Sequence, residues 1–419
     1  MTNVMDITIT TLGALIGLAV AIFLIVKKVE PAYSMIAGAF VGGVIGGAGI
    51  EGTVTCMVTG AQGIMPAILR IVTSGVLAGI LIQSGAAVKI ADQIIRLFGE
   101  KRALFSLALA TMILTAVGVF GDVAVITVAP IAMVIGQRIG CNNFILLAAL
   151  MGGEKAGMVI SPNPNTIAAA ETFGVDLSAL MAANIIPAIV GLAGTVIICK
   201  ILSGKNKSVN VADKTQSVEV NTQPMGLPSI WASIVGPLIA VILLMLRPIC
   251  GITIDPLVAL PAGAIIGLAC MRKMKHLGEY ISYGLGKMMP VAILLIGTGT
   301  ISGIIKTSQF QVDMTTVLNA MNLPAFLLAP ISGIVMAGAT IASATFSGTI
   351  TQIMPALYGA AMLHAGTIVL DSLPHGSIFH ASAGAMGMPI NERIKLLPID
   401  ILEGFIIVLA STIIYGIIL

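Results

Sequence analysis

Polar residues interrupt the apolar sequence in four clusters, and the first two contain acidic side chains that could exchange a proton. In the first cluster, GVFGDV at 118–123, Asp122 lies between two apolar runs. A carboxyl group there is costly unless it faces protein, water or a partner. In the second cluster, Glu154 and Lys155 are adjacent. We predict proton exchange at Asp122 or Glu154, with a helix cap and a structural ion pair with Lys155 as the respective alternatives.

The second cluster, GGEKAGMVISPNPNTIAAAE at 152–171, also contains two prolines and two asparagines that should interrupt a helix. Asn163 is a favourable N-cap residue and Pro164 suits the first helical position. A half-helix is therefore predicted to begin here, with its positive end facing the break. A carboxylate could bind the free N–H groups of this end together with the side chains of Asn163, Asn165 and Thr166.

The third cluster, ASATFSGTITQ at 342–352, is rich in hydroxyl groups. Hydroxyls beside exposed backbone suit the hydroxyls of a sugar-like ligand, so we predict a second helix break here. A single serine or threonine could instead bond to a carbonyl group of its own helix. The candidate binding residues of this cluster are Ser343, Thr345, Ser347, Gly348 and Thr349.

The fourth cluster lies between positions 364 and 382 in an otherwise apolar region, and all the histidines of the chain except His276 fall within it. Imidazole exchanges a proton near physiological pH. We predict that His364, Asp371 and His380 take part in proton exchange. The alternative for each histidine, taken alone, is a structural role.

The composition requires a solvent other than water for most of the chain. Hydrophobic residues make up 57% of the 419 positions, charged residues 9%, and the mean hydropathy is +1.07, beyond the range of soluble domains. Apolar runs of about 20 residues satisfy their backbone in lipid only as helices. The predicted fold is all-α, a polytopic membrane protein with about 12–14 membrane segments that include re-entrant hairpins and broken helices.

The polar stretch at 203–228 divides the chain near its middle and is predicted to be a cytoplasmic linker between an N-terminal transmembrane repeat, 1–202, and a C-terminal one, 229–419. Basic residues gather in the segments that face the cytoplasm if the N-terminus is outside. The two repeats are then inverted, as in alternating-access carriers, unless chance aligns their glycines. The matches, at an offset of 224, are Pro66, Gly75, Gly79, Ile80 and Ser84 with Pro290, Gly299, Gly303, Ile304 and Ser308.

Three stretches together resemble the gluconate:proton symporter (gluconate permease) family. They read LIQSGAAVKIADQIIRLFGEKRA at 81–103, VFGDVAVITVAPI at 119–131 and SPNPNTIAAAETFGVDL at 161–177. The family has a serine-glycine-glycine-alanine turn, which begins here with Ser84 and Gly85. The resemblance implies that these two residues contribute to substrate binding.

The resemblance further implies a multi-pass carrier of the bacterial inner (cytoplasmic) membrane, within the broader organic-anion ion transporter superfamily. Such a carrier takes up gluconate or a related sugar acid by proton-coupled symport with alternating access. The implied partners are the small organic anion, the lipid bilayer and a second copy in a homodimer, with no nucleic acid. No cofactor is implied, and the coupling ion is H⁺, with Na⁺ as the alternative.

The chain departs from this family at its proline-rich break, where the family's histidine is Asn163 and its Gly-Pro is Asn165 and Thr166. These residues are closer to the Ser-Asn-Thr tips of dicarboxylate carriers. A sodium- or proton-coupled di- or tricarboxylate transporter is therefore one alternative, and a cation/proton antiporter is another. The chain lacks the H-E-x-x-H, G-x-S-x-G and P-loop motifs, which argues against an enzyme or an ATP-driven pump. Its cysteines have no metal-ligand spacing.

Overall fold

The structure is a computed structural model that describes residues 7–27, 29–99, 102–205, 227–252, 254–310, 312–313, 316, 324–336, 339–373 and 377–419. The described residues are almost entirely helical, and their one isolated β-bridge joins Ile9 to Ser308. The all-α prediction is confirmed. Among the described helices, five are long and apolar enough to cross a membrane, or six if one bent pair is counted as a single span.

The helices of the two halves follow one another in a similar order. The first half contains α1 (Thr11–Val26), α2 (Pro31–Gly43), α3 (Gly49–Gln83), α4 (Ala86–Phe98), α5 (Ala103–Ala116), α6 (Gly121–Ile139), α7 (Asn143–Met158), α8 (Pro164–Phe173), α9 (Leu177–Ala183) and α10 (Ile185–Lys205). The second half contains α11 (Ile230–Cys250), α12 (Pro256–Cys270), α13 (Leu277–Thr307), α15 (Leu328–Met336), α16 (Ala339–Ile353), α17 (Ala356–Thr367), α18 (Ser377–Ala385) and α19 (Ile390–Thr412).

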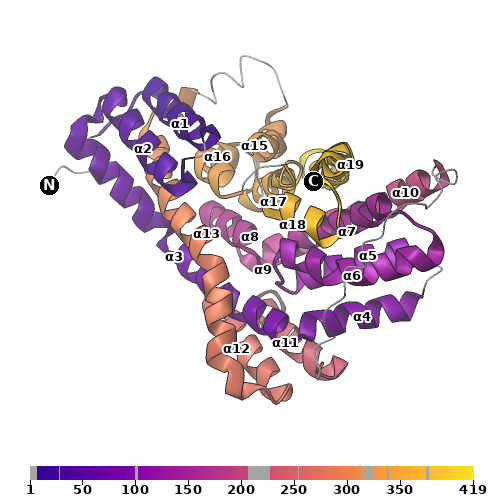
Figure 1. Cartoon of the computed structure of the whole chain (residues 1–419). Coiled ribbons are helices and arrows are strands. Elements are labelled where there is room, and N and C mark those ends of the chain that lie inside the picture. Colours follow the sequence, from indigo (N-terminus) through magenta and orange to yellow (C-terminus); the bar gives the residue numbers. More distant parts are fainter. Residues whose placement is uncertain are drawn as a thin grey trace.

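The helices form two groups (Figure 1). The long helices α3 and α13 pack along each other and carry α1, α2, α11 and α12, while the shorter helices α5–α10 and α15–α19 lie to the other side. Large apolar side chains such as Phe23, Ile186 and Trp231 are exposed on the outside of the molecule. Many large exposed apolar side chains are typical of a surface that faces lipid rather than water.

Glycines allow the backbones of α3 and α13 to meet. A Cβ atom at Gly60 would overlap Gly299 and Gly303, and a Cβ atom at Gly284 would overlap the carbonyl oxygen of Gly75. The two helices therefore run antiparallel with small residues at their contact, which is how helices approach closely in lipid. The contact is also reciprocal, because the offset of 224 pairs Gly60 with Gly284 and Gly75 with Gly299.

Short helices flank each of the expected interruptions in the first half. Helices α5 and α6 are joined by a turn in which Gly118 has a φ of 100°, a conformation that favours glycine. The chain then leaves α7 at Met158 and re-enters a helix at Pro164, and α8 and α9 meet at an angle of 111°. The predicted interruptions near Asp122 and Asn163 are thus confirmed.

The second predicted break, at 342–352, is wrong. Helix α16 runs without interruption from Ala339 to Ile353. The hydroxyl groups do not open the helix because they can bond within it. The Thr351 hydroxyl, for example, donates to the carbonyl oxygen of Ser347 at 2.9 Å, and the stretch has no proline to remove a backbone donor.

The polar linker falls largely outside the described residues. Helix α10 continues to Lys205, three residues beyond the predicted end of the first repeat at 202. The rest of the stretch up to 226 is not among the residues that the structure describes. The division into repeats at 1–202 and 229–419 stays a prediction.

Candidate functional site

The break between α7 and α8 lies against α17 in the second group, and charged and polar side chains join these elements. The Lys155 ammonium on α7 donates to the carbonyl oxygen of Ile368 at 2.6 Å and pairs with the carboxylate of Asp371, just beyond α17. Thr166, in the first turn of α8, lies 3.0 Å from Nε2 of His364 on α17. We call this region the helix crossing. It brings Thr166, from the second sequence cluster, together with His364 and Asp371, from the fourth.

The charge of Lys155 suits the helix end that it contacts. Ile368 is the C-cap residue of α17, and the last carbonyl groups of a helix carry a partial negative charge and lack intrahelical donors. An ammonium group satisfies both needs. Lys155 and His364 are fully buried, whereas the side chain of Asp371 is 15% exposed. The crossing is therefore largely closed to solvent in this conformation.

Asn163 organises the start of α8. Its side-chain oxygen accepts hydrogen bonds from the backbone amides of Asn165 at 2.8 Å and Thr166 at 3.1 Å, while its amide group donates to Met158 O at 2.6 Å. The predicted N-cap is confirmed. The sequence predicts free amide groups at this helix end, but the Asn163 side chain occupies those of Asn165 and Thr166. An anion there must displace the Asn163 side chain or bind beside it.

Replacing Asn163 by alanine is expected to lower the free energy of unfolding by about 1 kcal/mol, because two amides of α8 lose their acceptor. Thermal unfolding of the purified protein in detergent measures the effect. Asn163→Ser keeps a side-chain oxygen that accepts from these amides and is the control. An alanine variant that unfolds at the wild-type midpoint would contradict the capping role.

Glu154 and Asp122 lie at the tip of the α5–α6 hairpin. Glu154 is fully buried, and a Cβ atom at Gly121 would lie 3.0 Å from its carboxyl carbon. Asp122 follows in the first turn of α6. Acidic groups are favourable at such a helix N-terminus. Neither oxygen of Glu154 has a hydrogen-bond partner among the described residues, and Lys155 pairs with Asp371 rather than with its neighbour.

Three buried charged residues on α19 complete this region and were missed by the sequence reading. Arg393 and Asp400 are fully buried and form an ion pair at 2.7 Å. The Arg393 guanidinium lies 4.9 Å from the ring centre of Phe379, and Glu403 is buried one turn beyond Asp400. Charged residues that recur at helical spacing within an apolar run were the signal that could have found them.

The hydroxyl-rich cluster lies next to the helix crossing, because α16 packs against α8 and α17. Ser343, Ser347 and Thr349 are buried, and Gly348 is half-buried. The side chain of Thr345 is outside the described part of the chain. The structure therefore places these hydroxyl groups on a continuous helix that packs against α8.

His380 and the serine-glycine turn lie elsewhere. His380 is exposed on α18, where its ring packs edge-on against Phe379. Ser84 and Gly85 form the corner between α3 and α4, where Gly85 has a φ of 79°. Lys273 donates to the Ser84 carbonyl at 2.8 Å. This turn thus contacts Lys273, just beyond α12, and lies close to Leu227 and Pro228, and its predicted role in substrate binding stays a prediction.

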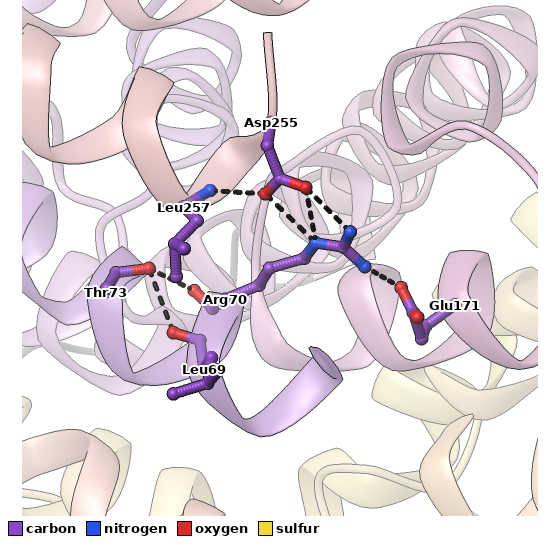
Figure 2. Close-up of polar contacts among 6 residues, drawn as sticks. All are labelled: Leu69, Arg70, Thr73, Glu171, Asp255 and Leu257. Atoms are coloured by element: carbon purple, nitrogen blue, oxygen red, sulfur yellow. Dashed lines mark hydrogen bonds and ion pairs between the residues drawn. The ribbon is translucent and has the colours of Figure 1, made fainter. Parts of the chain in front are cut away.

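A separate ion-pair cluster joins the two helix groups (Figure 2). Arg70 on α3 holds Asp255, the N-cap residue of α12, through contacts of 2.7–3.2 Å, and also pairs with Glu171 on α8. The hydrogen bonds from Arg70 hold the pKa of Asp255 below its ordinary value. A cavity of about 300 Å³ lies beside Arg70. Since its guanidinium is already paired with two carboxylates, the helix crossing is the better candidate site for an anion.

Comparison with known proteins identifies the family. The profile of the GntP family permeases matches residues 9–383. The chain belongs to the GntP permease family. An uncharacterized transporter of Haemophilus influenzae is 49% identical to this permease, over 98% of the permease and 99% of the relative. A gluconate permease of Pseudomonas aeruginosa is 26% identical over 56% of this permease and 53% of the relative.

A solved structure is similar in fold. The Alcanivorax borkumensis YdaH transporter aligns with 88% of the permease and 89% of its own chain, with a TM-score of 0.57 and 13% sequence identity. The family resemblance seen in the sequence is confirmed. Together with the apolar spans, it makes this chain an integral membrane transporter of the GntP permease family.

Proposed function

We propose that this permease takes up a small organic anion of the gluconate type together with protons. The proposal rests on Glu154, a buried acid beside the helix crossing. Lys155 pairs with Asp371, which leaves buried Glu154 without a hydrogen-bond partner among the described residues. An ionised carboxylate in that place bears a desolvation cost of several kcal/mol, and a bound proton removes it.

The anion is proposed to bind at the start of α8, next to the hairpin tip. The tip contacts Pro162 through Gly118 and Glu154 through Gly121, so an anion at the break and the Glu154 carboxyl share one hairpin tip. Two neighbouring negative charges repel each other strongly where water is excluded. Anion binding therefore favours protonated Glu154, and by linkage the proton raises the affinity for the anion by the same factor.

The polar groups of α16 support a hydroxylated substrate. Ser343, Ser347 and Thr349 are buried on a helix that packs against α8, and the Thr349 hydroxyl has no hydrogen-bond partner among the described residues. A buried hydroxyl that lacks a partner is costly. The hydroxyl groups of a sugar acid bound at the crossing would supply that partner.

Alternating access by two inverted repeats is part of the proposal. The reciprocal contacts of α3 and α13, in which Gly60 meets Gly299 and Gly284 meets Gly75, support it. Two inverted copies related by a pseudo-two-fold axis would produce such exchange of partners. The buried, closed state of the helix crossing also supports a cycle in which the site must open to either side.

Uptake into proteoliposomes tests the proposal. Purified permease is reconstituted, and radiolabelled gluconate is supplied with an inward proton gradient. Accumulation that a protonophore abolishes is the expected result. Uptake that requires Na⁺ and ignores the proton gradient, or proton flux without any organic anion, would instead favour the dicarboxylate carrier or the antiporter.

Replacing Glu154 by glutamine is expected to lower proton-driven gluconate uptake by about 5- to 150-fold, because the coupling between proton and anion is lost. Gluconate counterflow, which needs no net proton movement, is expected to persist. Glu279→Gln, at a side chain that is 68% exposed, is the matched control. A Glu154→Gln permease with full proton-driven uptake would remove Glu154 from the mechanism.

A further inference from the structure

Glu403 is a second buried acid that the proposed mechanism does not use. Its side chain is fully buried on α19, and neither carboxyl oxygen has a hydrogen-bond partner among the described residues. It occupies space that Gly152 leaves open on α7, where a Cβ atom would lie 2.8 Å from the Glu403 carboxyl carbon. The same Cβ atom would overlap the Thr195 hydroxyl on α10. Glu403 therefore lies where α7, α10 and α19 meet.

The surroundings of Glu403 contain both acidic and basic groups. On α19 itself lie Arg393 and Asp400, and α7 contributes Glu154 and Lys155. Buried Cys199 lies on α10, one turn beyond Thr195, and its thiol donates to the carbonyl oxygen of Ile145. The end of α17 packs against Gly404. The titratable groups on the α17 side are His364 and Asp371.

The ion pairs in this region leave two carboxyl groups over. Lys155 pairs with Asp371, and Arg393 pairs with Asp400. Each pair cancels its own charge, so Glu154 and Glu403 remain without a counter-charge of their own. A carboxylate without a partner is strongly unfavourable in a buried, low-dielectric position. Each of the two acids therefore needs a proton when the region is closed.

The two leftover acids pack against different elements. Glu154 contacts the hairpin tip at Gly121, whereas Glu403 contacts Gly152 and the α10 side. Lys155 and Asp400 are the charged groups that interact electrostatically with both acids. A change of charge at Glu403 thus acts on Lys155, and through it on the helix crossing, as well as on Glu154 itself.

We propose that Glu403 is a second proton-binding site, so that each transport cycle carries two protons with one monoanion. This inference rests on the proposed function, with Glu154 as the first site. Two protons with one negative charge move one net positive charge inward. Transport is then driven by membrane potential as well as by the pH gradient. A permease with Glu154 alone would carry no net charge.

The coupling ratio is measured from the accumulation of gluconate at equilibrium. Proteoliposomes receive a proton gradient of one pH unit, and valinomycin with equal K⁺ on both sides holds the membrane potential at zero. Each coupled proton contributes up to a tenfold gradient. Wild type is expected to accumulate gluconate about 100-fold, and Glu403→Gln about tenfold. An inside-negative potential should raise accumulation by wild type and leave Glu403→Gln unaffected.

Further variants keep the test decisive. Glu403→Leu removes the acid without leaving a buried amide and should also give about tenfold accumulation, which covers a glutamine variant that does not fold. Glu279→Gln should match wild type. A wild-type ratio of about tenfold, or an unchanged ratio in the Glu403 variants, would overturn the second site while leaving proton-coupled uptake intact. No proton-driven accumulation by wild type would instead overturn the proposed function itself.

Discussion

Replacing Lys155 by methionine is expected to lower the free energy of unfolding by about 3–5 kcal/mol, because it leaves a buried charge without its partner. The ammonium group is fully buried, pairs with Asp371 and donates to Ile368 O at 2.6 Å. Its loss leaves the largely buried Asp371 carboxylate without its counter-charge and the carbonyl group of Ile368 without its donor. Gluconate uptake should fall to background, because α7 would no longer be held to the end of α17 at the helix crossing.

Thermal unfolding in detergent and proteoliposome uptake measure the two effects. The double variant Lys155→Met with Asp371→Leu should recover much of the stability, since buried ion pairs can often be replaced by apolar residues. It should not recover uptake. Arg96→Met is the control, because the Arg96–Asp92 pair is exposed and such pairs contribute about 0–1 kcal/mol. A Lys155→Met variant as stable as the control would contradict the structural role of the crossing.

Replacing Gly284 by alanine is expected to destabilise the permease by about 1–3 kcal/mol or more, because the added methyl group would overlap the backbone of Gly75. A carbonyl oxygen in a packed helix cannot rotate away as a side chain can. The two long helices would have to separate, and both helix groups depend on them.

Gly286, two residues further along α13, offers a matched control. A Cβ atom there meets nothing within 4 Å, so Gly286→Ala should be neutral or stabilise by about 0.5–1 kcal/mol through the loss of glycine's backbone freedom. The unfolding midpoints of the two variants measure the difference. Equal midpoints would mean that the close contact of α3 with α13 is not needed for stability.

Local signals predicted some features well. The cap at Asn163 followed by Pro164 marks a helix start by chemistry within four residues, and the structure places α8 there. The same local reasoning failed at Ser347, because hydroxyl groups satisfy themselves inside a helix as readily as they open one. Proline decides between the two, since it removes a backbone donor and hydroxyl groups do not.

The sequence by itself determined an all-helical chain in lipid, its family and the first helix break, because these depend on composition and on neighbouring residues. The tertiary structure alone decided that Lys155 pairs with Asp371, 216 residues away, and that Glu403 fits beside Gly152. Helices in lipid are apolar on every side, so hydrophobic periodicity does not reveal which face is buried. Which charges meet inside the bundle is therefore set by backbone packing.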